Sequence, residues 1–581
     1  MLDRWITDDT PSERFEFYTR ANADEVGPEP FSPLGWTLGW ELGCIPGVAD
    51  GYVEFGAIKW SELRPDKPEV FGNWGGYFYN QLSVPRVMGV RMPGASPAGI
   101  DIAYFGDHPG VPPYVADPRD EDEECSENLA KTMAWVMSTD GYPAQDKAAE
   151  EAHALRRARP ELTTLSDTEL VAYARSMAHK IRESWGPYCY TCLAVSLGPG
   201  AVQAICAAIG RPEDAMRVLS AVGGVESAAA SVEMWDLSRT VAASADLTAA
   251  FDAGVDGILD RLRTTGSLDA ATFLDAFAAL LDEFGHRGPN EWDMRVDSWA
   301  TKPGLPLGMI DHLRHQDDHR SPHVAARTAA GERERLTAEL CELLAGDPET
   351  QATFRAGVHS SAVWYALREK GKNSVIRVIF EAKLALYELG RRMVERGVVS
   401  DPKHVFMITE RELDDFVADP TPWADTITAR EADFLLLHEL EPPYIVGRSQ
   451  PAPPISSWPR RDARVTGATV TVGEVLKGTP ASPGVVTGTA RIVNDPGDPG
   501  ELGPDDVMVV HTTDPSWAPL FLSVGGVVCN VGAPASHAAI VSREVGVPCA
   551  VSVIDATYRI PDGATIRVDG ASGTVEILAL P

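Results

Sequence analysis

The sequence lacks the features that mark several large classes of protein. Its 581 residues include eight cysteines, too few for a small disulfide-stabilised scaffold. Positive charge is scarce, with 51 Lys and Arg against 84 Asp and Glu and a formal net charge of −33, which argues against nucleic acid or an anionic membrane as a partner. No apolar run approaches the ~20 residues that span a bilayer, and the acidic N-terminus is unlike a targeting peptide. We therefore expect a cytoplasmic protein.

The single C-x-x-C motif, at Cys189 and Cys192, has no second motif to match it. A structural zinc site needs another cysteine pair or a histidine pair at a suitable spacing. A thioredoxin-like site needs a βαβ surrounding, whereas the flanking sequence here favours helix. We interpret both residues as structural thiols.

Four histidines lie near one another at spacings of three and four residues: His312, His315, His319 and His323. Such spacings place some of them on one helix face, as in metal sites, but the interleaved Asp317 and Pro322 fit a solvated loop equally well. Because there is no H-E-x-x-H arrangement, we assign no metal site to the chain.

The order of sequence patterns predicts a multidomain α+β protein. With 44% apolar and 23% charged residues the chain is globular, and its length predicts three or four domains of roughly 150 residues. Residues 1 to about 110 are rich in glycine, proline and aromatics and predict loops and short strands. A helical pattern follows, with a capping box at Ser166 and Glu169. From about residue 466, short β-branched runs alternate with turns and predict a compact α/β domain.

A proline-rich segment separates the helical region from the C-terminal region. Residues 442–459 contain six prolines, which favour extended, semi-rigid polyproline geometry. We therefore predict a mainly helical domain at 1–445, a hinge linker at 446–465, and a compact domain at 466–581 that is able to move.

His537 is the strongest candidate for a functional residue. Residues 527–531 predict a strand, Ser536 a helix N-cap, and Gly546 the end of a helix that begins at His537. The first turn of a helix presents backbone N–H groups and a positive dipole end, which bind phosphate oxygens and favour a neutral imidazole. Covalent phosphoryl transfer through histidine needs this arrangement, although an ordinary surface histidine fits the same pattern.

Three ordered blocks surround this histidine: Gly478–Gly484 with Gly488, Thr513–Pro519, and Ser536–Pro548. They are similar to the G-x-x-x-S-x-G turn, the T-x-P-x-W-x-P block and the phosphohistidine helix of the phosphoenolpyruvate-utilising enzymes. Phosphoenolpyruvate synthase, pyruvate phosphate dikinase and rifampin phosphotransferase belong to that family. The resemblance implies a swivelling phosphohistidine domain, with His537 as the phosphorylated residue and Ser536 as a phosphate-binding residue.

Two positions near His537 need separate comment. Members of the family often have a threonine where this chain has Ala535, which leaves Ser536 and backbone amides to contact the phosphate. Arg543 lies six residues after His537, about 240° round the helix. We therefore expect Arg543 to form a surface pair with Glu544 or to dock domains, rather than to touch the phosphate.

Further matching blocks occur earlier in the chain: Tyr18–Glu25, Pro30–Trp36, Gly285–Glu291, Arg368–Glu369 and Asp401–Leu413. In this order they resemble the substrate-binding domain of rifampin phosphotransferase-like proteins. ATP-using relatives also carry an ATP-grasp unit, which has no counterpart here, and no Walker-type loop replaces it. Phenylphosphate synthase divides the same machinery between subunits. The resemblance thus implies an ATP-grasp partner that uses ATP and Mg²⁺ to phosphorylate His537, releasing AMP and phosphate, with no cofactor bound tightly by this chain.

The acceptor site is expected to combine basic, acidic and aromatic side chains. His286 and Glu291 are candidate catalytic residues that accept the acceptor's proton, and Arg287 and Arg368 suit phosphate because a guanidinium donates paired hydrogen bonds. An equally good interpretation makes Arg287 and Glu291 a structural ion pair. The candidate substrate-binding residues are Arg20, Asn22, Trp36 and Trp74. The aromatic rings, with Trp40, Tyr77 and Tyr79, could line a flat apolar pocket, although core packing is the commoner role.

The leading interpretation is a phosphohistidine-carrying, acceptor-binding subunit of a dikinase-type phosphotransferase. It would phosphorylate a hydroxyl of a small aromatic or polycyclic molecule. One alternative uses a transient substrate phosphate for net condensation or dehydration, as in relatives that condense pyrroles. The other is a non-catalytic phosphohistidine relay or regulatory protein.

Overall fold

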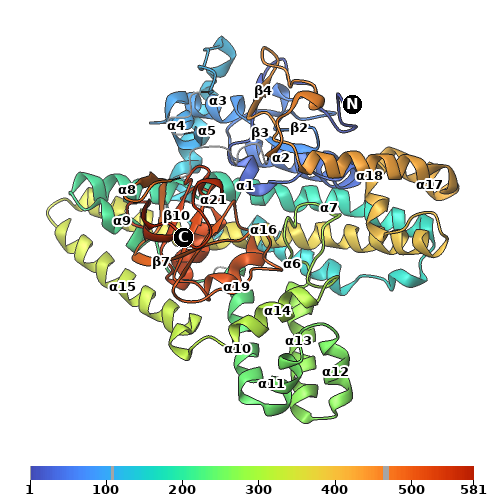
Figure 1. The fold of residues 1–581 in the computed structure, drawn as a ribbon. Helices are drawn as coiled ribbons and strands as arrows, with labels where there is room; N and C mark the ends of the chain where they lie inside the picture. Colours follow the sequence, from blue (N-terminus) through green and yellow to red (C-terminus); the bar gives the residue numbers. More distant parts are fainter. Residues whose placement is uncertain (1, 106–109, 225, 462–469, 535) are drawn as a thin grey trace. The chain divides into compact units, whose positions relative to one another are not determined.

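The chain forms two compact units in a computed structural model that describes residues 2–105, 110–224, 226–461, 470–534 and 536–581. The first unit comprises Met1–Ala194, Trp292–Arg295 and Lys370–Arg464, and the second comprises Val195–Glu291, Val296–Glu369 and Val465–Pro581. Figure 1 colours the elements in sequence order. Each unit is described by itself.

The first unit combines a small antiparallel sheet with helices. The sheet has the order β2-β3-β1-β4, so its last strand comes from a segment more than 360 residues after the others. Its strands are β1 (Phe17–Thr19), β2 (Phe71–Trp74), β3 (Tyr77–Gln81) and β4 (Ile445–Gly447). Its helices include α1 (Ala23–Val26), η1 (Gly35–Cys44), α2 (Ile45–Glu54), α3 (Ser83–Arg91), α4 (Pro97–Phe105), α5 (Glu123–Val136), α6 (Pro143–Arg157), α7 (Asp167–Ala194), α17 (Leu413–Ala418) and α18 (Ala424–His438).

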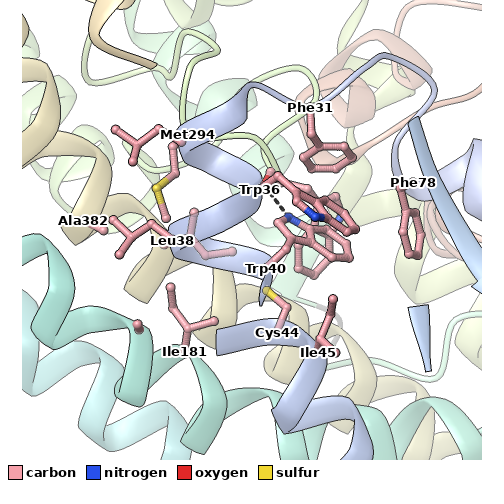
Figure 2. Close-up of a cluster of buried hydrophobic side chains, with 14 of the residues drawn as sticks. Phe31, Trp36, Leu38, Trp40, Cys44, Ile45, Phe78, Ile181, Met294 and Ala382 are labelled. Carbon is pink, nitrogen blue, oxygen red and sulfur yellow. Dashed lines mark hydrogen bonds between the residues drawn. The ribbon is translucent and has the colours of Figure 1, made fainter. Parts of the chain in front are cut away.

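The core of the first unit is rich in tryptophan. Trp36 and Trp40 stack at 5.4 Å with an interplanar angle of 11°, and Phe31 meets both rings edge-on. Figure 2 shows these rings beside Phe78, with aliphatic side chains from neighbouring helices around them. The glycine-rich residues 35–54, expected as loops and short strands, are helical, because glycines 43, 47 and 51 let η1 and α2 approach α7 closely.

The second unit contains helices and an eight-stranded mixed sheet. The strand order is β5-β12-β11-β7-β8-β9-β10-β6, with β7 to β10 parallel and the outer pairs antiparallel. The strands are β5 (Val475–Lys477), β6 (Thr479–Ser482), β7 (Val485–Ile492), β8 (Asp506–Val510), β9 (Gly526–Cys529), β10 (Cys549–Val551), β11 (Thr565–Asp569) and β12 (Thr574–Ala579). The helices that accompany the strands are α19 (Ala518–Phe521), α20 (His537–Val545) and α21 (Ala556–Arg559).

The second unit contains further helices, several of which pack with one face of this sheet. One apolar cluster holds Trp235, Phe284 and Ile310 from the helices together with Met508 and Val541 from the sheet region. The helices are α8 (Leu197–Ala208), α9 (Pro212–Val218), α10 (Glu226–Ala243), α11 (Ala245–Asp252), α12 (Ile258–Thr265), α13 (Leu268–Phe284), α14 (Gly304–Leu313) and α15 (Pro322–Leu343). Helix α16 (Pro348–Glu395) belongs to this unit up to Glu369 and to the first unit from Lys370.

The predicted multidomain α+β class is confirmed, with a large helical region and a C-terminal sheet domain. The predicted division at 1–445, 446–465 and 466–581 stays a prediction about functional domains. Within the predicted hinge, Trp458 is buried, and Arg461 donates hydrogen bonds to the Glu29 carboxylate at 3.1 Å and the Pro28 carbonyl at 2.7 Å. Residues up to 461 are therefore held by the first unit, whereas 462–469 lie outside the described residues.

One segment of the described chain, Asp167–Ala208, is long and apolar enough by length and composition to cross a membrane. A single segment of this kind is weak evidence, since core helices of soluble proteins pass the same test. Helix α7, which supplies most of it, contributes Ala174, Ile181 and Trp185 to the core of the first unit. The expected cytoplasmic location stays a prediction.

Candidate functional site

Helix α20 is built as the local sequence predicts. The hydroxyl of Ser536 accepts a hydrogen bond from the Ala539 amide at 3.3 Å and caps the helix, which begins at His537. The helix ends at Gly546, whose φ of +74° is the left-handed conformation that glycine adopts readily. His537 thus lies in the first turn, where the positive end of the helix dipole favours an anion. Ala535 lies outside the described residues.

A threonine from another segment holds the His537 ring. Nδ1 of His537 lies 3.2 Å from the Thr513 hydroxyl, and both side chains are buried, with His537 only 3% exposed. The ring also meets the edge of the Phe521 ring, with centroids 6.3 Å apart. Thr513 belongs to a predicted sequence block, but its contact with the histidine was missed. The two residues are 24 apart, and only the folded sheet brings their segments together.

The next residue, Asp514, joins this centre to the loop at 285–291. One carboxylate oxygen accepts hydrogen bonds from the amide and hydroxyl of Ser516, at 2.8 and 2.5 Å. The other accepts one from the amide of Asn290 at 3.0 Å. Asn290 has a φ of +53°, which turns the loop so that its amide faces the carboxylate. The structure therefore brings together two of the predicted motifs, which are 224 residues apart at this bond.

The loop that contains His286, Arg287 and Glu291 is buried and tightly folded. The Trp299 amide donates to the Arg287 carbonyl at 2.7 Å, and the Ala300 amide donates to that of Gly285 at 2.9 Å. A Cβ on Gly288 would lie 2.3 Å from the Asp297 carbonyl oxygen, so only glycine fits there. This packing fixes the backbone of the predicted acceptor-site residues.

Arg287 and Glu291 form the ion pair that one interpretation of the sequence predicted. Nη1 of Arg287 lies 3.0 Å from Oε1 of Glu291, and Arg287 is 1% exposed. Nη2 of Arg287 has no hydrogen-bond partner among the residues that the structure describes. The pair leaves the guanidinium with an unused buried donor, so a structural role and an anion-binding role are compatible.

The other predicted site residues belong to α16 and to the first unit. Arg368, on α16, donates a hydrogen bond to Oε1 of its neighbour Glu369 at 2.6 Å. In the first unit, Arg20 donates to the Phe78 carbonyl at 2.5 Å and the Gly27 carbonyl at 3.0 Å, and it packs over Tyr77. These contacts stabilise the fold around Arg20. The phosphate-binding role of Arg368 and the substrate-binding role of Arg20 stay predictions.

The remaining candidates of the first unit differ in exposure. Asn22 is exposed, with a φ of +53° at the start of α1. Trp36 is fully buried in the stacked cluster of Figure 2. Trp74 is buried, with its ring edge-on to those of Tyr18 and Tyr79 at 5.0 and 5.2 Å. Both tryptophans pack as core residues here, and their substrate-binding role stays a prediction.

Arg543 corrects one expectation about α20. It is buried rather than exposed, and its guanidinium donates to the carbonyls of Ala481 at 2.6 Å and Pro534 at 2.5 Å. A surface pair with Glu544 is therefore wrong, because Arg543 lies on the buried side of α20. Arg543 instead supports the backbone that leads into His537.

Contacts beyond Asp514 also join the sheet region to the helices of the second unit. The Glu544 carboxylate accepts a hydrogen bond from the Val222 amide at 3.0 Å, and its burial raises the pKa of this carboxyl. Arg320 donates to the carbonyls of Leu522 at 3.1 Å and Val524 at 2.5 Å. These contacts hold the sheet region against helices and loops of the second unit, within which His537 is buried.

The cysteines and the histidine group have local structural contacts. Cys189 is buried and Cys192 half-buried on α7, and all eight cysteines are unbridged. His319 contacts Asp317 at 2.7 Å, and His323 contacts Asp236 at 3.0 Å. Among the described residues, no group of three or more His, Cys, Asp or Glu side chains is placed to hold a metal ion.

Comparisons with known proteins match the two segments that the bond between Asn290 and Asp514 joins. Residues 190–369 match the family described as rifampicin phosphotransferase fourth domain, and residues 502–573 match the mobile domain of PEP-utilising enzymes. The chain is 32% identical over 336 residues to rifampicin phosphotransferase of Streptomyces sviceus, covering 57% of this chain and 37% of that enzyme.

Other relatives widen the range of chemistry. The prodigiosin synthesizing transferase PigC of Serratia marcescens is 29% identical over 375 residues, which cover 62% of this chain and 40% of that enzyme. An uncharacterised protein of Mycobacterium tuberculosis is 26% identical over 601 residues, covering 98% of this chain and 63% of the relative. The chain thus spans well under half the length of both named enzymes.

Proposed function

We propose, from the premise that this chain carries the mobile domain of the PEP-utilising enzymes, that His537 carries a phosphoryl group to a hydroxyl of a small organic molecule. The observation that carries the proposal is the position of His537. It begins a capped helix, its Nδ1 is bonded to Thr513, and Asp514 ties this centre to the loop of His286 and Arg287.

In the first half-reaction, Nε2 of His537 attacks a phosphorus atom of ATP. A hydrogen bond at Nδ1 directs attack to Nε2 and fixes the plane of the ring. Attack at the β phosphorus forms the P–N bond and breaks the bond to the α phosphate, so AMP leaves; one water then cleaves the β–γ bond and releases the γ phosphate, which leaves a single phosphoryl group on His537. The amides of the first turn of α20 and the Ser536 backbone face the transferred oxygens and stabilise their charge.

In the second half-reaction, the acceptor oxygen attacks the phosphorus and the P–N bond breaks. The acceptor's proton passes to His286 or Glu291, and Arg287 stabilises the transferring group through the donor that its ion pair with Glu291 leaves unused. Proximity supplies much of the rate, because the carrier delivers the group at high effective concentration. Arg368 is proposed as a second phosphate ligand.

The ATP-dependent half-reaction belongs, in this proposal, to a separate ATP-grasp subunit that binds ATP with Mg²⁺. His537 is only 3% exposed in the docked arrangement, so it must leave this position to meet a nucleotide. Release would break the contacts of Asp514 with Asn290 and of Glu544 with Val222. The proposed motion is the swivel that the resemblance implies.

The test is a reconstitution with the candidate ATP-grasp subunit and a panel of aromatic and polycyclic alcohols. AMP formation that requires both proteins, together with a phosphate monoester of the acceptor, supports the proposal. A His537→Asn variant should abolish both products while keeping the same thermal unfolding temperature. AMP and monoester formation by that variant would overturn the carrier role.

A second candidate function keeps the same first half-reaction but loses phosphate from the acceptor in a net condensation. The similarity to a prodigiosin synthesizing transferase favours it. Product analysis separates the two functions, since condensation yields a phosphate-free product and a second equivalent of inorganic phosphate. A relay protein without an acceptor reaction would give labelled His537 and neither product.

A further inference from the structure

A buried amide in the first unit lacks the hydrogen bonds that such a group needs. Gln145, on α6, is 0% exposed, and neither its Nε2 nor its Oε1 has a hydrogen-bond partner among the described residues. Buried side-chain amides are nearly always satisfied, because leaving a donor or acceptor unpaired costs the full desolvation penalty of that group. The partner of Gln145 is therefore expected to come from outside the chain.

Helix packing places this amide against an aromatic ring. A Cβ on Gly371 of α16 would lie 2.6 Å from Oε1 of Gln145 and 2.8 Å from Cδ2 of Tyr188. The amide and the ring thus meet at Gly371, where α16 has no side chain to separate them. Any group that pairs with Gln145 reaches the Tyr188 ring at the same time.

Two further rings extend this surface. Tyr188 stacks near Trp292, with centroids 6.0 Å apart and an interplanar angle of 24°, and Trp185 lies 4.9 Å from Tyr188 and 5.2 Å from Trp292. Lys372, on the same helix as Gly371, holds its ammonium 5.7 Å from the Trp292 ring centre. The flat faces of the Tyr188 and Trp292 rings therefore have the Gln145 amide near one ring and the Lys372 ammonium near the other.

This order of groups defines the chemistry of a ligand. A carboxamide or lactam presents an N–H and a C=O side by side, which pair with the C=O and N–H of a glutamine amide. A fused aromatic ring matches the tyrosine and tryptophan faces, and an electron-rich hydroxyl or carbonyl group suits the ammonium.

We propose that Gln145, Tyr188, Trp292 and Lys372 bind a planar aromatic compound that carries a carboxamide or lactam. The identification of this compound as the phosphoryl acceptor rests on the proposed function. Its binding to these four residues does not. All four side chains are at least nine-tenths buried. The rings must part for the compound to enter, so association is slower than ordinary docking.

The experiment measures binding of 3-hydroxy-2-naphthamide to the full chain by tryptophan fluorescence and calorimetry. Its N,N-dimethylamide, which cannot donate a hydrogen bond, and 2-naphthol serve as comparison compounds. Wild-type protein should bind the primary amide about tenfold more tightly than either. Gln145→Leu, of similar volume, should remove that preference, whereas Ser231→Ala, which removes a buried hydroxyl in the second unit, should keep it.

Unfolding temperatures complete the test. Without ligand, Gln145→Leu should unfold at a higher temperature than wild type, because it removes a polar group that no part of the described chain satisfies. A lower unfolding temperature with unchanged binding would mean that Gln145 holds a structural water, and would overturn the proposal. So would equal affinity of wild type for the three compounds. Gln145→Met provides a second near-isosteric variant. His537→Asn should bind the amide as wild type does, which separates this test from that of the carrier function.

Discussion

Replacing Thr513 by valine tests whether its hydroxyl positions the phosphoryl acceptor. The two side chains have nearly the same shape, so the change removes only the hydrogen bond at 3.2 Å to Nδ1 of His537. Leaving a buried acceptor or donor without that partner costs about 1–3 kcal/mol. If the same energy is lost in the transition state of phosphoryl transfer, the rate falls by about 5- to 150-fold.

The assay is single-turnover phosphorylation of His537, followed by quenching and counting of protein-bound label. Thr513→Ser keeps the hydroxyl and should restore most of the rate. Thr512→Val is the matched control, since Thr512 is adjacent and only half-buried, whereas the hydroxyl that bonds to His537 belongs to Thr513. Wild-type rates in Thr513→Val, or an equal loss in Thr513→Ser, would refute the positioning role.

Other changes test the surroundings of this centre. Ser536→Ala removes the cap of α20 and should lower the free energy of unfolding by about 1 kcal/mol in urea titrations. Arg287→Met leaves the buried Glu291 uncompensated and should cost about 3–5 kcal/mol, much of which the additional change Glu291→Leu should recover. Gly288→Ala forces a Cβ to within 2.3 Å of a carbonyl oxygen and should destabilise the fold by about 1–3 kcal/mol, visible as a lower unfolding temperature. Burial raises the pKa of Glu544 above its ordinary 4.5, so the folded protein binds a proton more readily than the unfolded chain. The free energy of unfolding should fall as pH rises from 4.5 through the raised pKa, and less so in Glu544→Gln.

The sequence was most informative where structure is local. The cap at Ser536 and the stop at Gly546 act within one turn of α20, so the bounds of that helix followed from single residues. The capping box before α7 is of the same kind, with the Glu169 amide donating to Ser166 at 3.3 Å and the Ser166 amide donating to Glu169 at 2.7 Å. Such signals need no knowledge of the rest of the fold.

Contacts between residues that are far apart in the sequence do not follow from such local signals. The bond of Thr513 to His537 depends on the pairing of β8 with β9, and the bond of Asn290 to Asp514 depends on how helices pack on the sheet. The burial of Arg543 has the same origin, because periodicity places a residue on a helix face but does not show what covers that face.

The length of helix α16, which runs from Pro348 to Glu395, does not follow from intrinsic helix preference either. Its first half carries the polar residues and the glycines at 357 and 371, which lower helix propensity. These glycines are required by close packing, since a Cβ at 357 would meet the Gly198 carbonyl at 3.1 Å and one at 371 would meet Gln145. Tertiary contacts therefore extended the helix beyond its intrinsic preference.

The central claim, that His537 is the phosphoryl carrier, is tested most directly by locating label on the protein. The chain is incubated with the candidate ATP-grasp subunit and ATP labelled at the β or the γ phosphorus, and the modified residue is identified by mass spectrometry under alkaline conditions that preserve phosphohistidine. The account predicts acid-labile label from the β phosphorus on His537, absent from His537→Asn. A stable complex of the two proteins that leaves His537 unlabelled, or label elsewhere in the variant, would contradict it.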